Sequence, residues 1–263
     1  MTGEVRHFTV HHDGVAIPVT RGGRGRPLVL VPGLSSTQAD LRELAELLRR
    51  DHDVVTFDLR GHGLASAADR YSFAGFLGDL AAVTAESGLT SPPVLVGYSL
   101  GADLVVHHAA GHPGTFAELV LIDGANPVPE PFLTEDTLPV FRAMWEEQAA
   151  EAVRDRGTAR QVLLTGQDIL DLNVELDALR SRVLDRYRAI DAPVRMIMST
   201  SLAGDSDEGP APRVNRLWRA GVERLTHELP HVPVSWIDAD HGLVFTHAAE
   251  IAGVVRSPHG TAS

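Results

Sequence analysis

Gly97-Tyr98-Ser99-Leu100-Gly101 is the segment of this 263-residue chain that is most informative about its fold. The apolar residues 93–96 lead into it, and residues 100–110, with a helical pattern, lead out of it. A serine between two glycines at a strand-to-helix turn can adopt the strained backbone that lifts its hydroxyl clear of a sheet. The stretch therefore predicts an accessible nucleophilic oxygen at the end of a buried strand.

Short apolar runs alternate with helical segments on both sides of this turn. Strands are predicted at residues 28–31, 54–57, 94–96, 119–122, 194–199 and 234–237, after a hairpin formed by residues 6–11 and 15–20. Helices are predicted at residues 40–50, 73–87, 100–110, 213–225 and 248–255. Continuous apolar strands separated by helices indicate an α/β protein with a mostly parallel, doubly wound sheet covered on both faces.

The alternation stops at residues 126–131, where three prolines interrupt any helix. Residues 133–190 are helix-like, and five apolar residues recur there at helical spacing on one face: Leu176, Leu179, Val183, Leu184 and Tyr187. This insertion after the sixth strand is either a cap over a site or another layer of the core, and its position favours a cap. We therefore expect an α/β core at residues 1–126 and 191–256, a helical cap at 127–190 and a flexible tail at 257–263.

The composition excludes several classes of function. A net charge of -12 disfavours nucleic acid or an anionic membrane surface as a partner, because both require a basic face. The chain has no cysteine, which excludes a disulfide framework, a thiolate metal site and a thiol nucleophile. Residues 1–7 lack the pattern of a secretory signal, and no apolar run reaches 18 residues, so a cytoplasmic protein without a membrane span is expected.

Three further segments accompany the turn in a fixed order. They are Val31-Pro32-Gly33-Leu34 after the third strand, Asp58-Leu59-Arg60-Gly61-His62-Gly63 after the fourth, and Asp240-His241-Gly242 after the last. With these segments the chain resembles the α/β-hydrolase fold family over nearly its whole length. The resemblance implies that Ser99 is a nucleophile and that His241, in the loop after the final strand, is the base that takes its proton.

Two aspartates compete for the acid that would orient His241. Most members of the family place it beyond the seventh strand, where this chain has Leu202, although a longer loop could bring Asp205 back to the site. Some branches, including haloalkane dehalogenases and zearalenone-type lactonases, use the end of the sixth strand, where this chain has Asp123. We favour Asp123, because a strand end is a rigid mount, and keep Asp205 as the alternative.

The resemblance also implies an oxyanion hole and an apolar substrate site. The backbone N–H groups of Leu34 and Leu100 are the expected oxyanion donors, even though Pro32 replaces a histidine common among relatives. Besides Leu34, the residues expected to face substrate are Tyr98, Phe132, Leu138, Phe141, Met144 and Trp145. The last five could instead pack the interior of the cap.

These features predict a serine hydrolase that cleaves an ester, lactone or thioester of a small molecule through an acyl-enzyme. Ser99 disfavours epoxide hydrolysis and dehalogenation, which would use an aspartate nucleophile. Acyl transfer, cofactor-free cyclisation or C–C bond hydrolysis on the same site is one alternative, and a binding protein without turnover is another. We expect no metal and no cofactor, a small-molecule acyl substrate as the partner, and a monomer or homodimer.

Overall fold

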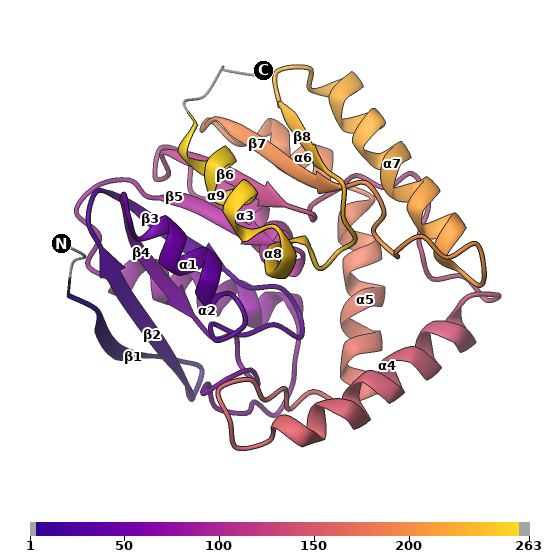
Figure 1. Cartoon of the computed structure of the whole chain (residues 1–263), viewed down its shortest axis with the longest axis horizontal. Helices are drawn as coiled ribbons and strands as arrows, with labels where there is room; N and C mark the ends of the chain where they lie inside the picture. Colours follow the sequence, from indigo (N-terminus) through magenta and orange to yellow (C-terminus); the bar gives the residue numbers. More distant parts are fainter. Residues whose placement is uncertain (1–3, 258–263) are drawn as a thin grey trace.

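A sheet of eight strands runs through the computed structural model, which describes residues 4–257. Its strands are β1 (Arg6–His12), β2 (Val15–Gly23), β3 (Arg26–Val31), β4 (His52–Phe57), β5 (Val94–Tyr98), β6 (Glu118–Ile122), β7 (Val194–Ser199) and β8 (Val234–Ile237). They lie side by side in the order β1-β2-β4-β3-β5-β6-β7-β8 (Figure 1). The hairpin β1-β2 joins antiparallel, and the strands from β4 to β8 are parallel. The predicted fold class is confirmed.

Alternate residues of the buried strands pack on opposite faces of the sheet. In β3, Leu28 and Leu30 join one apolar cluster, whereas Val29 and Val31 join the other. The first cluster is covered by α1 (Arg42–Leu48), α8 (Leu243–Thr246) and α9 (Ala248–Arg256). The second is covered by α2 (Phe73–Glu86), α3 (Leu100–Gly111), α6 (Val183–Arg188) and α7 (Ala211–Glu228). Burial on both faces is the reason that these strands read as continuous apolar runs.

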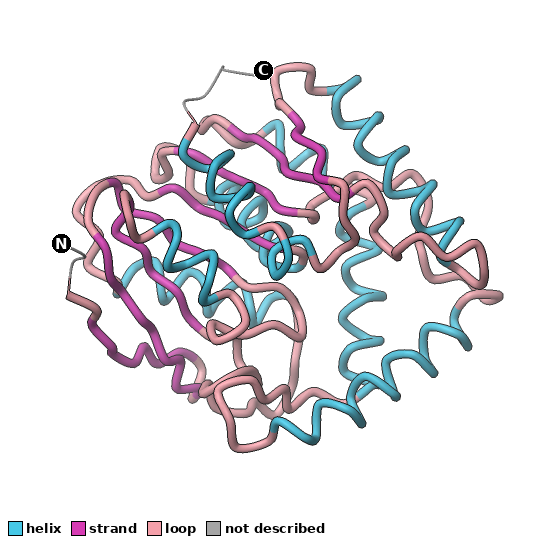
Figure 2. The backbone as a smooth tube through the Cα atoms, in the orientation of Figure 1, coloured by secondary structure: helices cyan, strands magenta, loops and turns pink. Residues whose placement is uncertain are grey.

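Two helices of the inserted region lie beyond the carboxyl ends of the central strands, α4 (Leu138–Ala152) and α5 (Gly166–Arg180) (Figure 1). They pack against each other and are joined through the short turn η1 (Val153–Asp155) and a loop. Another loop carries residues 123–137 from β6 to α4 (Figure 2). In the loop between η1 and α5, residues 161 and 163 bond to residues 63 and 61, which ties this region to the loop after β4.

The five apolar residues that predicted one helical face belong to two helices. Leu176 and Leu179 lie in α5, which ends at Arg180, and the other three lie in α6. The prediction of a single face was wrong, because both helices turn apolar residues toward the same core and the spacing persists across the break. Since α6 packs against α3, the region contains a core-layer helix as well as the α4–α5 pair. The division at residues 127 and 190 stays a prediction.

Two expectations concern the ends and the environment of the chain. The predicted tail falls almost entirely on residues 258–263, which lie outside the described residues. Within residues 4–257, no helix combines the length and apolar character that crossing a bilayer requires.

Candidate active site

Ser99 sits at the sharp turn between β5 and α3 in a strained backbone conformation, with φ of 53° and ψ of -120°. Gly97 and Gly101, two residues to either side, allow this turn because they have no side chain. A Cβ on Gly101 would lie 2.4 Å from the carbonyl oxygen of Val31, and a Cβ on Gly97 would lie 2.4 Å from that of Gly101. Positive φ at a serine is uncommon, and such strain concentrates at functional sites.

A chain of hydrogen bonds joins Ser99, His241 and Asp123. The Ser99 hydroxyl donates to His241 Nε2 over 2.9 Å, and His241 Nδ1 donates to Asp123 Oδ2 over 2.7 Å. These side chains follow the carboxyl ends of β5, β8 and β6, which the parallel sheet brings to one edge. The histidine is therefore held in the tautomer that leaves Nε2 free to accept the serine proton.

Asp123 is fully buried and is itself fixed by three donors. Its Oδ1 accepts from the backbone N of Ser199 at 2.9 Å, the hydroxyl of Ser199 at 3.0 Å and Nε1 of Trp218 at 3.0 Å. Three hydrogen bonds stabilise a carboxylate that would otherwise be costly to bury. Asp205 is exposed in the loop after β7, and the structure brings Asp123, not Asp205, against His241.

Neither Ser199 nor Trp218 was singled out from the sequence. Trp218 lies in α7, 95 residues beyond Asp123, and an indole in a helical pattern is indistinguishable from an ordinary core residue. Ser199 ends a buried strand, which is equally ordinary. Only the position of α7 against the sheet edge brings the two to the same carboxylate oxygen.

The expected oxyanion donors are the backbone N–H groups of Leu34 and Leu100. Neither backbone N–H has a hydrogen-bond acceptor among residues 4–257, and Leu100 is the first residue of α3. A Cβ on Gly33 would lie 3.0 Å from Ser99 Cβ. The loop that carries Leu34 therefore lies close to Ser99. Two unpaired N–H groups beside a nucleophile can stabilise a developing oxyanion.

His62, which lies in the Asp58–Gly63 segment, holds the neighbouring part of this loop. Its Nε2 accepts from the backbone N of Ser35 at 3.1 Å, and its Nδ1 donates to the carbonyl of Arg60 at 2.9 Å. The ring is fully buried, and burial lowers the pKa of His62 to about 4. The neutral ring that this bonding requires is therefore the stable form at neutral pH.

Ser99, Asp123 and His241 open into a cavity of about 450 Å³. Four of the residues expected to face substrate line it: Phe132, Phe141, Met144 and Trp145. Most of the remaining wall is apolar and comes from α5, the loop after β7 and α7. Such a cavity suits a small, largely apolar molecule.

Three expected contacts do not line this cavity. Tyr98 lies behind the histidine, where its hydroxyl donates to the carbonyl of His241 at 2.8 Å, and burial raises the pKa of this phenol. Leu138 lines a second cavity of about 540 Å³, and Leu34 packs, partly buried, against the apolar cluster that α2 and α3 cover. These residues were expected near the site from the sequence, but the face on which a side chain lies depends on its position along the strand or helix.

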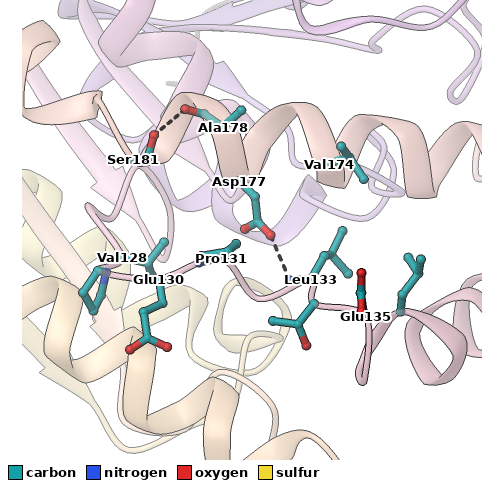
Figure 3. Close-up of a pocket in the computed structure, with 12 residues that line it drawn as sticks. Val128, Glu130, Pro131, Leu133, Glu135, Val174, Asp177, Ala178 and Ser181 are labelled. Atoms are coloured by element: carbon teal, nitrogen blue, oxygen red, sulfur yellow. Dashed lines mark hydrogen bonds between the residues drawn. The ribbon is translucent and has the colours of Figure 1, made fainter.

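A polar strip on α5 completes the wall of the active-site cavity. It contains Asn173, Asp177 and Arg180, which helical spacing puts on one face. Asp177 also borders the second cavity, and its carboxylate accepts from the backbone N of Leu133 at 3.0 Å (Figure 3). The sequence analysis missed this strip, because polar residues at helical spacing are typical of a solvated face. No group of three or more histidine, aspartate or glutamate side chains within residues 4–257 is arranged to hold a metal ion.

Comparison with known proteins identifies a matching family and individual relatives. The sequence profile of a family described as alpha/beta hydrolase fold matches residues 26–217. N-formylmaleamate deformylase of Pseudomonas putida is 38% identical over 105 residues, which are 39% of this chain and 38% of the relative. 2-(Acetamidomethylene)succinate hydrolase of Mesorhizobium japonicum is 25% identical over 196 residues, 74% of this chain and 66% of the relative. The matches thus span about two-fifths and two-thirds of these relatives.

A solved carboxylesterase structure from Nitrososphaera gargenis superposes with a TM-score of 0.71. It is 19% identical, and the alignment covers 95% of this chain and 96% of that one. At this identity the likeness concerns the fold.

Proposed function

Because this chain belongs to the alpha/beta hydrolase fold family, we propose that it is a serine hydrolase that cleaves an ester, lactone or thioester of a small molecule. The observation that carries the proposal is the unbroken run of hydrogen bonds from Ser99 through His241 to the buried Asp123. That run opens into a mostly apolar cavity. The names of the curated relatives, a deformylase and a hydrolase, agree with hydrolytic chemistry.

In the proposed mechanism, Ser99 Oγ attacks the carbonyl carbon of the substrate while its proton passes to His241 Nε2. The carbonyl oxygen becomes an oxyanion that accepts from the N–H groups of Leu34 and Leu100, each worth about 3 kcal/mol. Asp123 stabilises the imidazolium. His241 then protonates the leaving oxygen or sulfur, and an acyl-enzyme remains.

Hydrolysis of the acyl-enzyme uses the same groups in reverse. His241 Nε2 takes a proton from water, the resulting hydroxide attacks the acyl carbon, and the proton returns to Ser99 Oγ as the acid leaves. For a lactone the leaving alcohol stays attached to the acyl group, so one product is released instead of two. The α4–α5 pair is proposed as the cap that covers this chemistry.

The test is covalent labelling with a fluorophosphonate, followed by an activity panel. We expect label on Ser99 of the wild-type protein, no label on Ser99→Ala, and unchanged labelling of the control Ser206→Ala, which alters an exposed serine. The panel contains p-nitrophenyl esters, an aryl thioester, macrolactones, and amides of the kinds in the relatives' names. Full turnover by Ser99→Ala would contradict the mechanism, and absence of both label and turnover in the wild type would favour a binding protein.

A further inference from the structure

Arg180, at the end of α5, stands in the wall of the active-site cavity with part of its guanidinium group unpaired. Its Nε and Nη2 donate to the carboxylate of Asp103, at 3.0 Å and 2.6 Å. A guanidinium carries five N–H donors, so both donors of Nη1 and one of Nη2 remain. Nη1 has no acceptor among residues 4–257 and is not enclosed by protein atoms, although the side chain is only 10% exposed. Because Arg180 lines the active-site cavity, Nη1 is the donor that a ligand bound there would use.

The position of Arg180 is fixed close to the nucleophile. Asp103, its partner, lies four residues after Ser99 in α3, which is about 6 Å along the helix axis. The guanidinium also lies over the ring of Trp218, 5.8 Å from the centroid. A donor held on two sides loses little freedom when it binds a ligand. Arg180 and Ser99 line the same cavity, so a molecule that acylates Ser99 enters the space that Arg180 borders.

The charges around Arg180 restrict what it can bind. Burial lowers the pKa of Arg180, but the carboxylates of Asp103, Asp177 and Asp123 together raise it above its usual value. With neutral His241, the three aspartates and the arginine sum to -2. Burial raises the pKa of Asp177, and a proton on its carboxyl would still leave a sum of -1. Arg213, the other arginine that acts on Asp177, is directed to Glu130 at 3.4 Å.

We propose that Arg180 is a specificity-determining residue that donates from Nη1 to an uncharged carbonyl oxygen of the substrate, outside the bond that is cleaved. A ketone, ester or amide oxygen accepts this charge-assisted hydrogen bond without bringing a charge. A carboxylate at the same place would add negative charge to a buried site that already carries an excess of it. The substrate class is therefore a neutral acyl compound with a second carbonyl, and this statement rests on the proposed ester hydrolysis.

Three p-nitrophenyl esters of equal chain length test the proposal: those of hexanoic acid, 5-oxohexanoic acid and, as the monoester, adipic acid. For the wild type we expect kcat/KM for the ketone to exceed that for hexanoate about tenfold, the value of one hydrogen bond to a charged donor. The adipate monoester should be about tenfold poorer than hexanoate. Turnover of the adipate monoester equal to or faster than that of hexanoate would overturn the proposal.

The variant is the double substitution Arg180→Met with Asp103→Leu, because removing the arginine alone would leave a buried carboxylate uncompensated. It should hydrolyse hexanoate and 5-oxohexanoate with equal kcat/KM, a loss of the whole tenfold preference. Arg142→Met, which removes an exposed arginine of α4 outside the cavity wall, should keep the preference. A double variant that retains the wild-type preference would contradict the role of Arg180.

Binding to the Ser99→Ala protein separates this proposal from the proposed hydrolysis. Calorimetry with methyl 5-oxohexanoate and methyl hexanoate should show about tenfold tighter binding of the ketone, lost in the triple variant that also lacks Asp103 and Arg180. Selective binding without hydrolysis by the wild type would overturn the esterase proposal alone. Equal binding of the two esters would overturn the role of Arg180 alone.

Discussion

The substitution Asp123→Asn tests the proposed triad at the residue where the geometry is most specific. Oδ1 of this carboxylate accepts from two fixed N–H groups, Ser199 N and Trp218 Nε1, and from the Ser199 hydroxyl, which can rotate. An amide NH₂ placed there would leave two buried N–H donors unsatisfied, at about 1–3 kcal/mol each. The asparagine oxygen therefore takes the Oδ1 place, and its NH₂ takes the Oδ2 place.

That orientation reverses the tautomer of the histidine. The amide NH₂ would face His241 Nδ1, which is 2.7 Å from Asp123 Oδ2 in the wild type, so Nδ1 must accept and the ring proton moves to Nε2. Nε2–H then points at Ser99 Oγ and cannot take its proton. A histidine held in the wrong tautomer lowers kcat by about 10⁴-fold, which is about 5.5 kcal/mol on the barrier.

The assay is p-nitrophenolate release from p-nitrophenyl hexanoate, together with the rate of fluorophosphonate labelling. Both rates should fall together while the melting temperature stays close to that of the wild type, because the substitution keeps the size of the side chain. Asp205→Asn, at the exposed alternative, serves as the matched control and should be unimpaired. An active Asp123→Asn beside an inactive Asp205→Asn would refute the assignment of the acid.

Three other measurements follow from the same structure. Trp218→Phe removes one of the three donors to Asp123, and we expect kcat to fall about tenfold with little change in KM; an unchanged kcat would exclude a positioning role for the indole. Gly101→Ala places a Cβ against the carbonyl of Val31 and should lower the free energy of unfolding by about 3 kcal/mol, measured by urea denaturation. Wild-type stability of this variant would show that the turn at Ser99 can relax. The pKa of His62 is lowered to about 4 in the fold, so the unfolded chain binds the additional proton between pH 6.5 and 4. Stability should therefore fall by about 3 kcal/mol as the pH drops through this window, and His62→Gln, whose amide can replace the two hydrogen bonds, should flatten that part of the profile.

Local patterns in the sequence were enough to predict the sheet and the strained turn at Ser99. Parallel strands buried on both faces are written as apolar runs, and a turn with positive φ at Ser99 needs glycines within two residues. The apolar runs and the glycines around Ser99 are both formed by residues that lie close together in the chain. The helical insertion was located for the same reason, but its internal break at Arg180 was not, because apolar spacing continues from α5 into α6.

The residues that complete the site depend on contacts across the chain. Choosing between Asp123 and Asp205 requires knowing which carboxylate lies against His241, 118 residues beyond Asp123. The pair between Arg180 and Asp103 joins residues 77 apart, and each looks like a solvated charge in its own helix. In the folded protein both side chains are buried and fixed by their ion pair. The sequence does not show this, because burial depends on how the two helices pack.

The parallel sheet and the turn at residues 97–101 could be predicted from the sequence, because each is encoded by residues close together in the chain. The pairing of Ser99 with His241, which are 142 residues apart, was implied only by the family resemblance. Only the tertiary structure decided which acid faces His241 and which side chains line the cavity. The same holds for Arg180, which is paired with Asp103 and lines the cavity. These outcomes depend on how separate elements pack at the carboxyl edge of the sheet, where distances in space bear no relation to distances along the sequence.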